Sequence, residues 1–187
     1  SDDDPESLVG SLMGDFVKGR VGDELDPSIR RGVILHRKVD VFTDSHALIR
    51  TSKRRISPAF RRYAGILVDI FYDHFLASSW SEYSPEPLED FAEHVYKLLQ
   101  ARQHLLPDGL KLVATRMVEQ NWLVSYRHFE VVGKALHRIS RRLSRPLPLA
   151  DATEDLVRDE DLLKSDFREF MREAGRFVRE ETVRNPF

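Results

Sequence analysis

Apolar side chains recur at intervals of three and four residues along most of this chain, and valine and isoleucine do not alternate with polar residues. The first pattern places apolar residues on one face of a helix, whereas strict alternation is typical of a half-buried strand. We therefore expect helices throughout and no strand. The predicted helices cover residues 5–18, 26–41, 57–76, 88–105, 110–120 and 129–143, followed by acidic C-terminal helices that begin at 151–154.

Several helix ends carry capping signals. The first helix is expected to stop at Gly19, because glycine tolerates the backbone conformation that ends a helix. Asp26 is expected to cap the second helix, with Pro27 at its first position, and Asp44 to cap the short helix that follows. The core residues expected from the C-terminal helices are Leu156, Leu162, Phe167, Phe170 and Phe177.

Irregular connections separate these helices. Serine, proline and two aromatic residues mark 78–87 as an irregular segment, and 107–109 and 145–148 are further breaks. Residues 122–126 are expected to form a separate turn. Because the chain shows no internal repeat and no low-complexity tract, residues 1–187 predict a single irregular, multi-helix, all-α domain.

Composition narrows the chemistry. With 187 residues, 41% of them apolar, the chain is long enough for one domain with a substantial core. No apolar run approaches the roughly 20 residues that cross a bilayer, and no signal peptide opens the sequence. We therefore expect a soluble, cytoplasmic protein. Because cysteine is absent, any metal ion has to bind nitrogen and oxygen ligands.

Acidic and imidazole side chains stand inside apolar runs at helical spacing. His36 and Asp40 are four residues apart, as are Asp69 and Asp73, so each pair shares one helix face. Asp15 is a further acid among apolar neighbours. Buried charges need a partner, and a divalent cation between facing helices would supply one. Such ligands suit manganese, magnesium, iron or zinc in the hydrolysis of phosphate esters.

Ordinary structural roles are the competing interpretation of the same residues. A single His and Asp pair at helical spacing is common on a solvated face. Asp15 would then cap a helix or pair with Arg20 or Arg37, and Asp69 would pair with an arginine of Arg61–Arg62. Asp15, the pair His36 and Asp40, and the pair Asp69 and Asp73 occur together in one chain, and this combination favours the metal site.

Two basic clusters are the second signal. Six basic residues fall between Arg50 and Arg62, and another set lies near the end of the helix predicted at 129–143. Positive surfaces attract acidic proteins or nucleic acids. Because the formal net charge is −2, general nucleic-acid binding is disfavoured, and a solvated helix face is the alternative. The two sets contain Arg50, Lys53, Arg54, Arg55, Arg61 and Arg62, and Lys134, Arg138, Arg141, Arg142 and Arg145.

Four motifs, in this order, closely resemble those of the acyl carrier protein phosphodiesterases, over about residues 8–177. They are Gly14–Gly19, His36–Asp44, Asp69–Leu76 with Trp80, and Trp122–Tyr126. The resemblance implies an all-helical, divergent relative of the HD-type metal-dependent phosphohydrolases that prefers manganese. It also implies hydrolysis of the phosphodiester between 4'-phosphopantetheine and a serine of acyl carrier protein. That carrier is strongly acidic, so it suits the basic sets; neither a membrane nor a nucleic acid is an expected partner.

The family motifs, together with the spacing, suggest roles for individual residues. The expected ligands of Mn²⁺ or Mg²⁺ are Asp15, His36, Asp69 and Asp73, although spacing alone leaves open which are direct ligands. Arg37 is expected to offset charge on the phosphate oxygens, and Asp40 or His74 to orient a ligand or to handle the leaving-group proton. The residues expected to bind the carrier protein are Lys53, Arg54, Arg55, Arg61 and Arg62.

Two features depart from the family pattern. Family members usually begin with a short histidine-containing segment, whereas this sequence opens with Ser1–Asp4. We expect that segment to be missing, which would leave the site incomplete if its histidines bind metal. The pair Asp73-His74 also reverses the order that names the HD enzymes. The alternative functions are an HD-type nucleotide phosphohydrolase and a non-catalytic helical module that binds an acidic protein or RNA.

Overall fold

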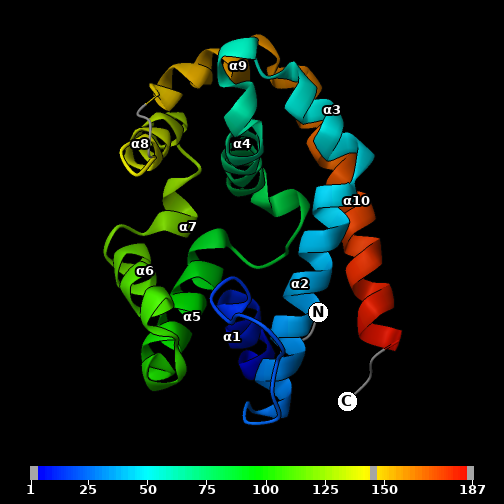
Figure 1. The fold of residues 1–187 in the computed structure, drawn as a ribbon, viewed down its shortest axis with the longest axis vertical. Helices are drawn as coiled ribbons and strands as arrows, with labels where there is room; N and C mark the ends of the chain where they lie inside the picture. The colour runs from blue at the N-terminus through cyan, green and yellow to red at the C-terminus, as the bar shows by residue number, and fades with distance from the viewer. Residues whose placement is uncertain (1–3, 144–146, 185–187) are drawn as a thin grey trace. The chain divides into compact units, whose positions relative to one another are not determined.

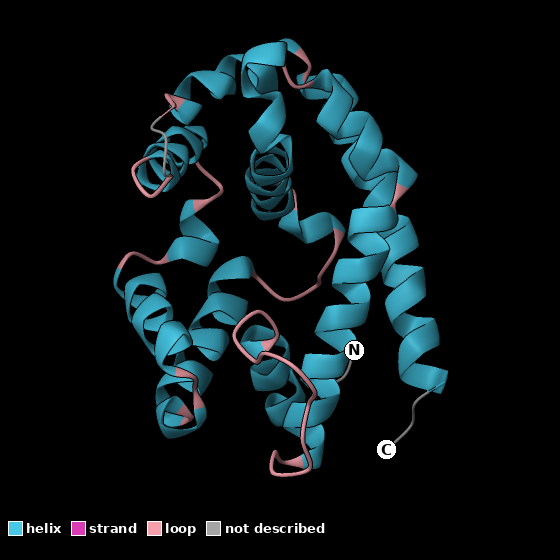
Figure 2. Ribbon diagram, in the orientation of Figure 1, coloured by secondary structure: helices cyan, strands magenta, loops and turns pink. Residues whose placement is uncertain are grey.

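The computed structural model describes residues 4–143 and 147–184, and every regular element in these ranges is helical (Figures 1 and 2). The predicted all-α fold is confirmed there. No helix among the described residues is both long and apolar enough to traverse a bilayer. The α-helices are α1 (Pro5–Met13), α2 (Pro27–Ser45), α3 (Ala47–Arg55), α4 (Ala64–Ser78), α5 (Leu88–Ala101), α6 (Asp108–Glu119), α7 (Trp122–Ser125), α8 (Phe129–Ser140), α9 (Thr153–Arg158) and α10 (Glu160–Arg184). The 3₁₀ turns are η1 (Pro58–Tyr63), η2 (Trp80–Glu82), η3 (Gln103–Leu105) and η4 (Leu149–Ala152).

The described residues form two compact units, each assembled from segments that are far apart in the sequence. Unit 1 contains Glu89–Trp122 and the described parts of Ser1–Asp44 and Ala174–Phe187. Unit 2 contains Ser45–Leu88 and the described part of Leu123–Glu173. The expectation of a single domain over residues 1–187 stays a prediction.

In unit 1, α1 and α2 cross at two glycines. A Cβ atom on Gly32 would lie 2.9 Å from Gly10 Cα, and a Cβ atom on Gly10 would lie 3.0 Å from Gly32 Cα. Any larger residue at either position would therefore push the helices apart, because close-packed backbones cannot absorb the extra volume. Val9 of α1 and Val33 of α2 are fully buried. This crossing holds the end of α1 close to α2.

Helix α4 is surrounded by other elements of unit 2. It packs against α3, η1 and α8, and its side chains Leu67, Phe71 and Phe75 are almost inaccessible to solvent. The ring of Phe75 lies 5.7 Å from that of Phe167 on α10. The apolar positions of α4 therefore form the core of this unit.

The start of α2 agrees with the prediction, whereas the end of α1 does not. The Asp26 carboxylate accepts a hydrogen bond from the Ser28 N–H at 2.8 Å, and Pro27 begins the helix. Helix α1 ends at Met13 instead of residue 18. The chain leaves the helix early, and the Phe16 side chain then lies against Gly109. Local signals do not report such a distant contact.

The predicted cap at Asp44 is wrong. Helix α2 continues through Ser45, and His46 caps α3 instead. Nδ1 of His46 accepts from the Leu48 N–H at 3.3 Å, while its Nε2 lies 3.1 Å from Glu173 Oε2. An imidazole has two nitrogens and can serve the helix end and the acid together, which a carboxylate inside the last turn of α2 cannot do.

The predicted core of the C-terminal helices is mostly correct. Leu156, Phe167 and Phe170 are buried, but Leu162 is 50% exposed. Phe177 is partly exposed and stacks on Phe42 with ring centroids 4.5 Å apart. Arg145, a predicted member of the second basic set, lies outside the described residues.

Candidate metal centre

Asp15, His36 and Asp40 meet at one point of unit 1. Asp15 Oδ1 and Asp40 Oδ2 each lie 3.3 Å from His36 Nε2. One ligand atom from each of the three residues lies within 4.8 Å of the others. Helical spacing already placed His36 and Asp40 on one face of α2. The tertiary fold adds Asp15 from 21 residues before His36.

Gly14 makes room for this arrangement. Its backbone angles, φ −50° and ψ −45°, are helical and open to any residue. A Cβ atom at Gly14, however, would lie 2.8 Å from His36 Cβ and closer still to two atoms of the imidazole ring. The absence of a side chain at Gly14 therefore lets the His36 ring approach the loop that carries Asp15.

Arg37 holds the same loop in place. Its guanidinium donates hydrogen bonds to the backbone carbonyls of Val17 and Gly19, each at 2.7 Å. Lys18 Nζ also donates to the backbone carbonyl of Asp15 at 2.6 Å. These contacts fix the loop beside α2, and they are what Arg37 does in this structure. Its expected action on phosphate oxygens stays a prediction.

The three side chains fit a divalent cation with nitrogen and oxygen ligands. Ligand atoms about 2.1 Å from an ion and roughly 90–100° apart lie about 3.0–3.3 Å from each other, which matches the separations at His36 Nε2. An imidazolium that donates to a carboxylate gives similar distances, but it carries one positive charge against two negative ones. A cation balances both carboxylates.

The candidate ligands are more exposed than the sequence suggested. The side chains of Asp15, Asp40 and His36 are 72%, 55% and 26% exposed, and Asp69 and Asp73 are exposed as well. The interpretation that these acids are buried among apolar residues was therefore wrong. Their apolar neighbours in the sequence turn toward the core while the acids face solvent, so a large substrate has access to them.

Helix α4 in unit 2 carries three more predicted site residues, Asp69, Asp73 and His74. Although the Asp73 side chain is accessible to solvent, dense surrounding protein raises the pKa of Asp73 to about 7, with a further increase from the negative charge of Asp69. An acid with a raised pKa exchanges a proton near neutral pH, which suits acid–base catalysis.

His74 is the buried member of this group, only 8% exposed. Its Nδ1 lies 2.8 Å from the backbone carbonyl oxygen of Tyr126. Because a carbonyl only accepts hydrogen bonds, Nδ1 carries a proton, and Nε2 is the nitrogen left for a second partner. Metal-binding histidines often show this second contact to a carbonyl, which orients the ring.

The predicted site residues are thus divided between the two units. Unit 1 holds Asp15, His36 and Asp40, so Asp40, predicted as a catalytic residue, stands with two predicted ligands. Unit 2 holds the three residues of α4. The predicted set of four metal ligands combines residues of both units and stays a prediction.

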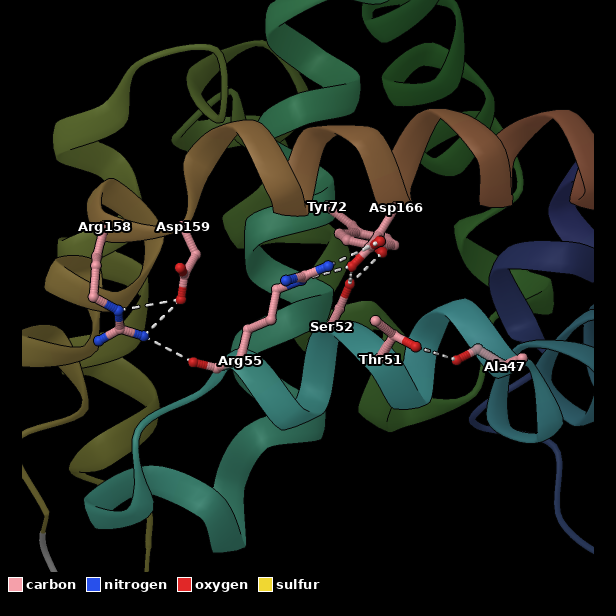
Figure 3. A network of polar contacts seen from close by, with 8 residues as sticks. All are labelled: Ala47, Thr51, Ser52, Arg55, Tyr72, Arg158, Asp159 and Asp166. Carbon is pink, nitrogen blue, oxygen red and sulfur yellow. Dashed lines mark hydrogen bonds and ion pairs between the residues drawn. The ribbon is translucent and has the colours of Figure 1, made fainter.

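Arg55 differs from the other residues predicted to bind the carrier protein. Its Nε lies 2.9 Å from Asp166 Oδ2, and its side chain is only 24% exposed (Figure 3). This hydrogen bond raises the pKa of Arg55. Arg55 therefore has an internal partner in unit 2, and its expected contact with a carrier protein stays a prediction. The remaining members are exposed or half-buried: Lys53, Arg54, Arg61 and Arg62.

Sequence reasoning missed the buried polar network around Asp166 (Figure 3). The Ser52 hydroxyl donates to Asp166 Oδ2 at 3.0 Å and lies 2.8 Å from the Tyr72 hydroxyl. Ser52 is fully buried, and burial raises the pKa of Tyr72 to about 12. The network links α3, α4 and α10. One signal was available, because Asp166 directly precedes the predicted core residue Phe167.

Comparison with known proteins identifies the family. The profile of the family described as acyl carrier protein phosphodiesterase matches residues 1–174. The acyl carrier protein phosphodiesterase of Photorhabdus laumondii is 31% identical over 173 residues, 90% of this chain and 87% of that protein. Those of Klebsiella pneumoniae and Escherichia coli are 32% and 31% identical, each over 88% of this chain and 86% of the relative. No solved structure gives a significant match. The chain therefore belongs to the acyl carrier protein phosphodiesterase family.

Proposed function

We propose that this protein is a metal-dependent phosphodiesterase that acts on holo acyl carrier protein. It hydrolyses the phosphodiester between 4'-phosphopantetheine and the carrier serine, which leaves the apo carrier. The observation that carries the proposal is the convergence of Asp15, His36 and Asp40 in a chain of this family. The HD-type relationship, the preference for manganese and a cytoplasmic location belong to the same proposal.

The ligand set is the basis for the metal dependence. Asp15, His36 and Asp40 would hold Mn²⁺ or Mg²⁺ through one nitrogen and two carboxylates. A divalent cation would supply two effects. It would withdraw charge from the phosphoryl oxygens, and it would lower the pKa of bound water, so that hydroxide is available as the nucleophile at neutral pH. Gly14 and Arg37 position this set through the loop contacts described above.

The residues of α4 supply the proton chemistry in this proposal. Asp73, whose pKa is raised to about 7, can donate or accept a proton near neutral pH. Nδ1 of His74 is engaged with the Tyr126 carbonyl, so Nε2 is the atom that would exchange a proton or bind a metal ion. Asp69 keeps negative charge next to Asp73 and so favours the protonated form of that acid. The serine alkoxide that leaves phosphorus requires such a proton.

The exposed part of the first basic set would bind the acidic carrier. Arg54, Arg61 and Arg62 face solvent, and their charges should accelerate encounter with an acidic protein. Lys53 is half-buried and belongs to the same surface. Arg55, which is held by Asp166, would contribute less to this surface than its exposed neighbours.

The test is hydrolysis of purified holo carrier protein, followed by mass spectrometry. With added manganese the carrier should lose the mass of its prosthetic group, and with a chelator it should not. Asp15→Asn should lower the rate at least about 100-fold. The matched control is Asp108→Asn, because the Asp108 side chain in unit 1 is 99% exposed; this variant should retain full activity.

A panel of nucleotides incubated in parallel separates the alternative substrate class. Hydrolysis of a nucleotide without any change in holo carrier would assign the protein to nucleotide chemistry. Full manganese-dependent activity of Asp15→Asn would remove the metal centre from the proposal. A carrier whose mass stays constant under all conditions would refute the phosphodiesterase assignment.

A further inference from the structure

Helix α8 carries a second positive surface, which we name the α8 basic face: Lys134, Arg138, Arg141 and Arg142. All four side chains are exposed. Lys134, Arg138 and Arg141 follow one another at intervals of four and three residues, so they share one side of the helix. The other side is buried, with Val132 and Leu136 fully inaccessible. The face is therefore a stripe of cations that points away from the core of unit 2.

Three of the four cations of this face have no acidic partner in the described part of the chain. Among the residues that the structure describes, no carboxylate lies within ion-pair distance of Lys134, Arg141 or Arg142. Cations elsewhere in unit 2 do have such partners. Lys164 Nζ lies 2.6 Å from Glu160 Oε1, and Arg168 Nη2 lies 3.4 Å from Glu82 Oε1. Lys134, Arg141 and Arg142 thus keep their charges available to an anionic partner molecule.

The α8 basic face lies close to the site residues of α4. Helix α4 packs against α8 and against α3 and η1, and Figure 1 shows α8 and α3 on opposite sides of α4. Burial raises the pKa of the Tyr126 phenol to about 12; the nearby charge of Asp73 raises this pKa further, and that of Arg138 lowers it, so both side chains lie near this ring. The Tyr126 carbonyl in turn orients His74. An anionic partner seated on α8 would therefore lie next to the helix that carries Asp69, Asp73 and His74.

We propose that the α8 basic face is a second docking surface for the acidic carrier protein, which contacts the α3 and η1 surface and the α8 basic face on either side of α4. This inference rests on the proposed function and deepens it. Lys134 and Arg141 are seven residues apart, about 10 Å along the helix axis. Acids spaced by a few turns on a partner helix can meet cations at that separation. Two surfaces specify the orientation of the carrier as well as its approach, because electrostatic complementarity sets register.

A different explanation assigns Arg141 and Arg142 to the end of α8, where cations stabilise the helix dipole. That explanation does not involve Lys134, which stands inside the helix. It predicts a loss of thermal stability without a loss of carrier binding. The two explanations therefore differ in a measurement that separates binding from stability.

The experiment compares two triple variants of the whole chain. The first is Lys134→Gln with Arg141→Gln and Arg142→Gln. The control is Arg116→Gln with Arg176→Gln and Arg179→Gln, which removes the same charge from exposed positions of unit 1. Binding of holo carrier is measured by fluorescence anisotropy with a chelator present, and hydrolysis by steady-state kinetics with manganese. A small phosphodiester serves as the substrate that needs no docking.

The α8 variant should bind the carrier about tenfold more weakly at low ionic strength and show a similar rise in KM. Its kcat and its activity on the small phosphodiester should match those of the control variant. The difference should shrink in high salt, because screening weakens exposed charges. Combining the α8 changes with Arg54→Gln, Arg61→Gln and Arg62→Gln should multiply the two losses if one carrier touches both surfaces.

Equal carrier binding by the α8 variant and the control would overturn the inference. Wild type that binds the carrier without hydrolysing it would refute the proposed function alone, and the binding comparison would still decide the role of α8. If wild type neither binds nor hydrolyses the carrier, the proposed function and the docking role of the α8 basic face are both refuted. Selective loss of single-stranded RNA binding in the α8 variant, with carrier binding intact, would assign the face to a nucleic acid instead.

Discussion

Replacing Gly14 by alanine perturbs the candidate metal centre without removing any ligand. The backbone of Gly14 is helical, so alanine fits its conformation. The added Cβ would, however, lie 2.8 Å from His36 Cβ and closer to the imidazole ring. Non-bonded carbons require about 3.5 Å, so the backbones that carry the two Cβ atoms have to separate and the ring has to turn away. Since His36 is partly exposed, it can do so, and His36 Nε2 then leaves the position it shares with Asp15 and Asp40.

Gly14→Ala should change both the stability of the metal-free protein and its affinity for manganese. Overpacking costs about 1–3 kcal/mol, and exchanging glycine for alanine in helical conformation returns about 0.5–1 kcal/mol, so the metal-free protein should lose only about 0–2.5 kcal/mol. Misplacing a ligand should weaken metal binding about 10–100-fold. At manganese concentrations 100 times the wild-type Kd, stabilisation by the ion should fall from about 2.7 to about 0.4–1.4 kcal/mol.

The assay is thermal unfolding with and without manganese, supported by calorimetric titration. For a chain of this length 1 kcal/mol corresponds to about 2–4 °C, so wild type should gain about 5–10 °C and Gly14→Ala about 1–5 °C. The control is Gly133→Ala on α8, where the nearest atom to a new Cβ is 3.9 Å away. This control should keep the full response to manganese. A Gly14→Ala protein with wild-type manganese affinity would refute the reasoning.

Three further changes test other parts of the structure. Arg37→Ala removes two charged hydrogen bonds to the loop at residues 17–19. It should lower the free energy of unfolding in urea by about 1–3 kcal/mol and make amide exchange in that loop faster. Unchanged exchange would show that Arg37 does not hold the loop. Asp26→Ala removes the cap of α2 and should cost about 1 kcal/mol, which Asp26→Ser should largely restore. Because the folded protein raises the pKa of Asp73 to about 7, this group stabilises the metal-free fold fully only below its unfolded pKa, about 4. That contribution is lost as the pH rises to about 7. The melting temperature of wild type relative to Asp73→Asn should therefore fall across this interval, and a constant difference would exclude the shift.

Part of the candidate site follows from helix geometry alone. His36 and Asp40 are neighbours because residues four apart share a helix face, and the structure places both at the same point. Asp15 could be named as a candidate but not positioned. Its approach depends on the crossing of Gly10 with Gly32 and on the open space at Gly14, both of which are contacts between distant residues.

Tertiary packing also determines which acids are exposed and which cations have internal partners. The apolar neighbours of Asp69 in the sequence suggested that it is buried. A helix exposes one side and buries the other, however, and the packing of α4 decides that Asp69 lies on the exposed side. Similarly, Arg54 and Arg55 are adjacent in the sequence. One faces solvent, whereas the other reaches Asp166 from α10, a partner that no local pattern could identify.

The sequence by itself determined the helical class, the start of α2 at Pro27 and the residue types that could bind a metal. These properties depend on periodicity, capping and side-chain chemistry, which act over a few residues. Only tertiary contacts explain where α1 ends, that the ring of His46, which caps α3, also meets Glu173, and that Asp15 joins His36. Each of these outcomes depends on atoms brought together from distant positions, where packing and shared hydrogen bonds outweigh local preference by a few kilocalories per mole at most.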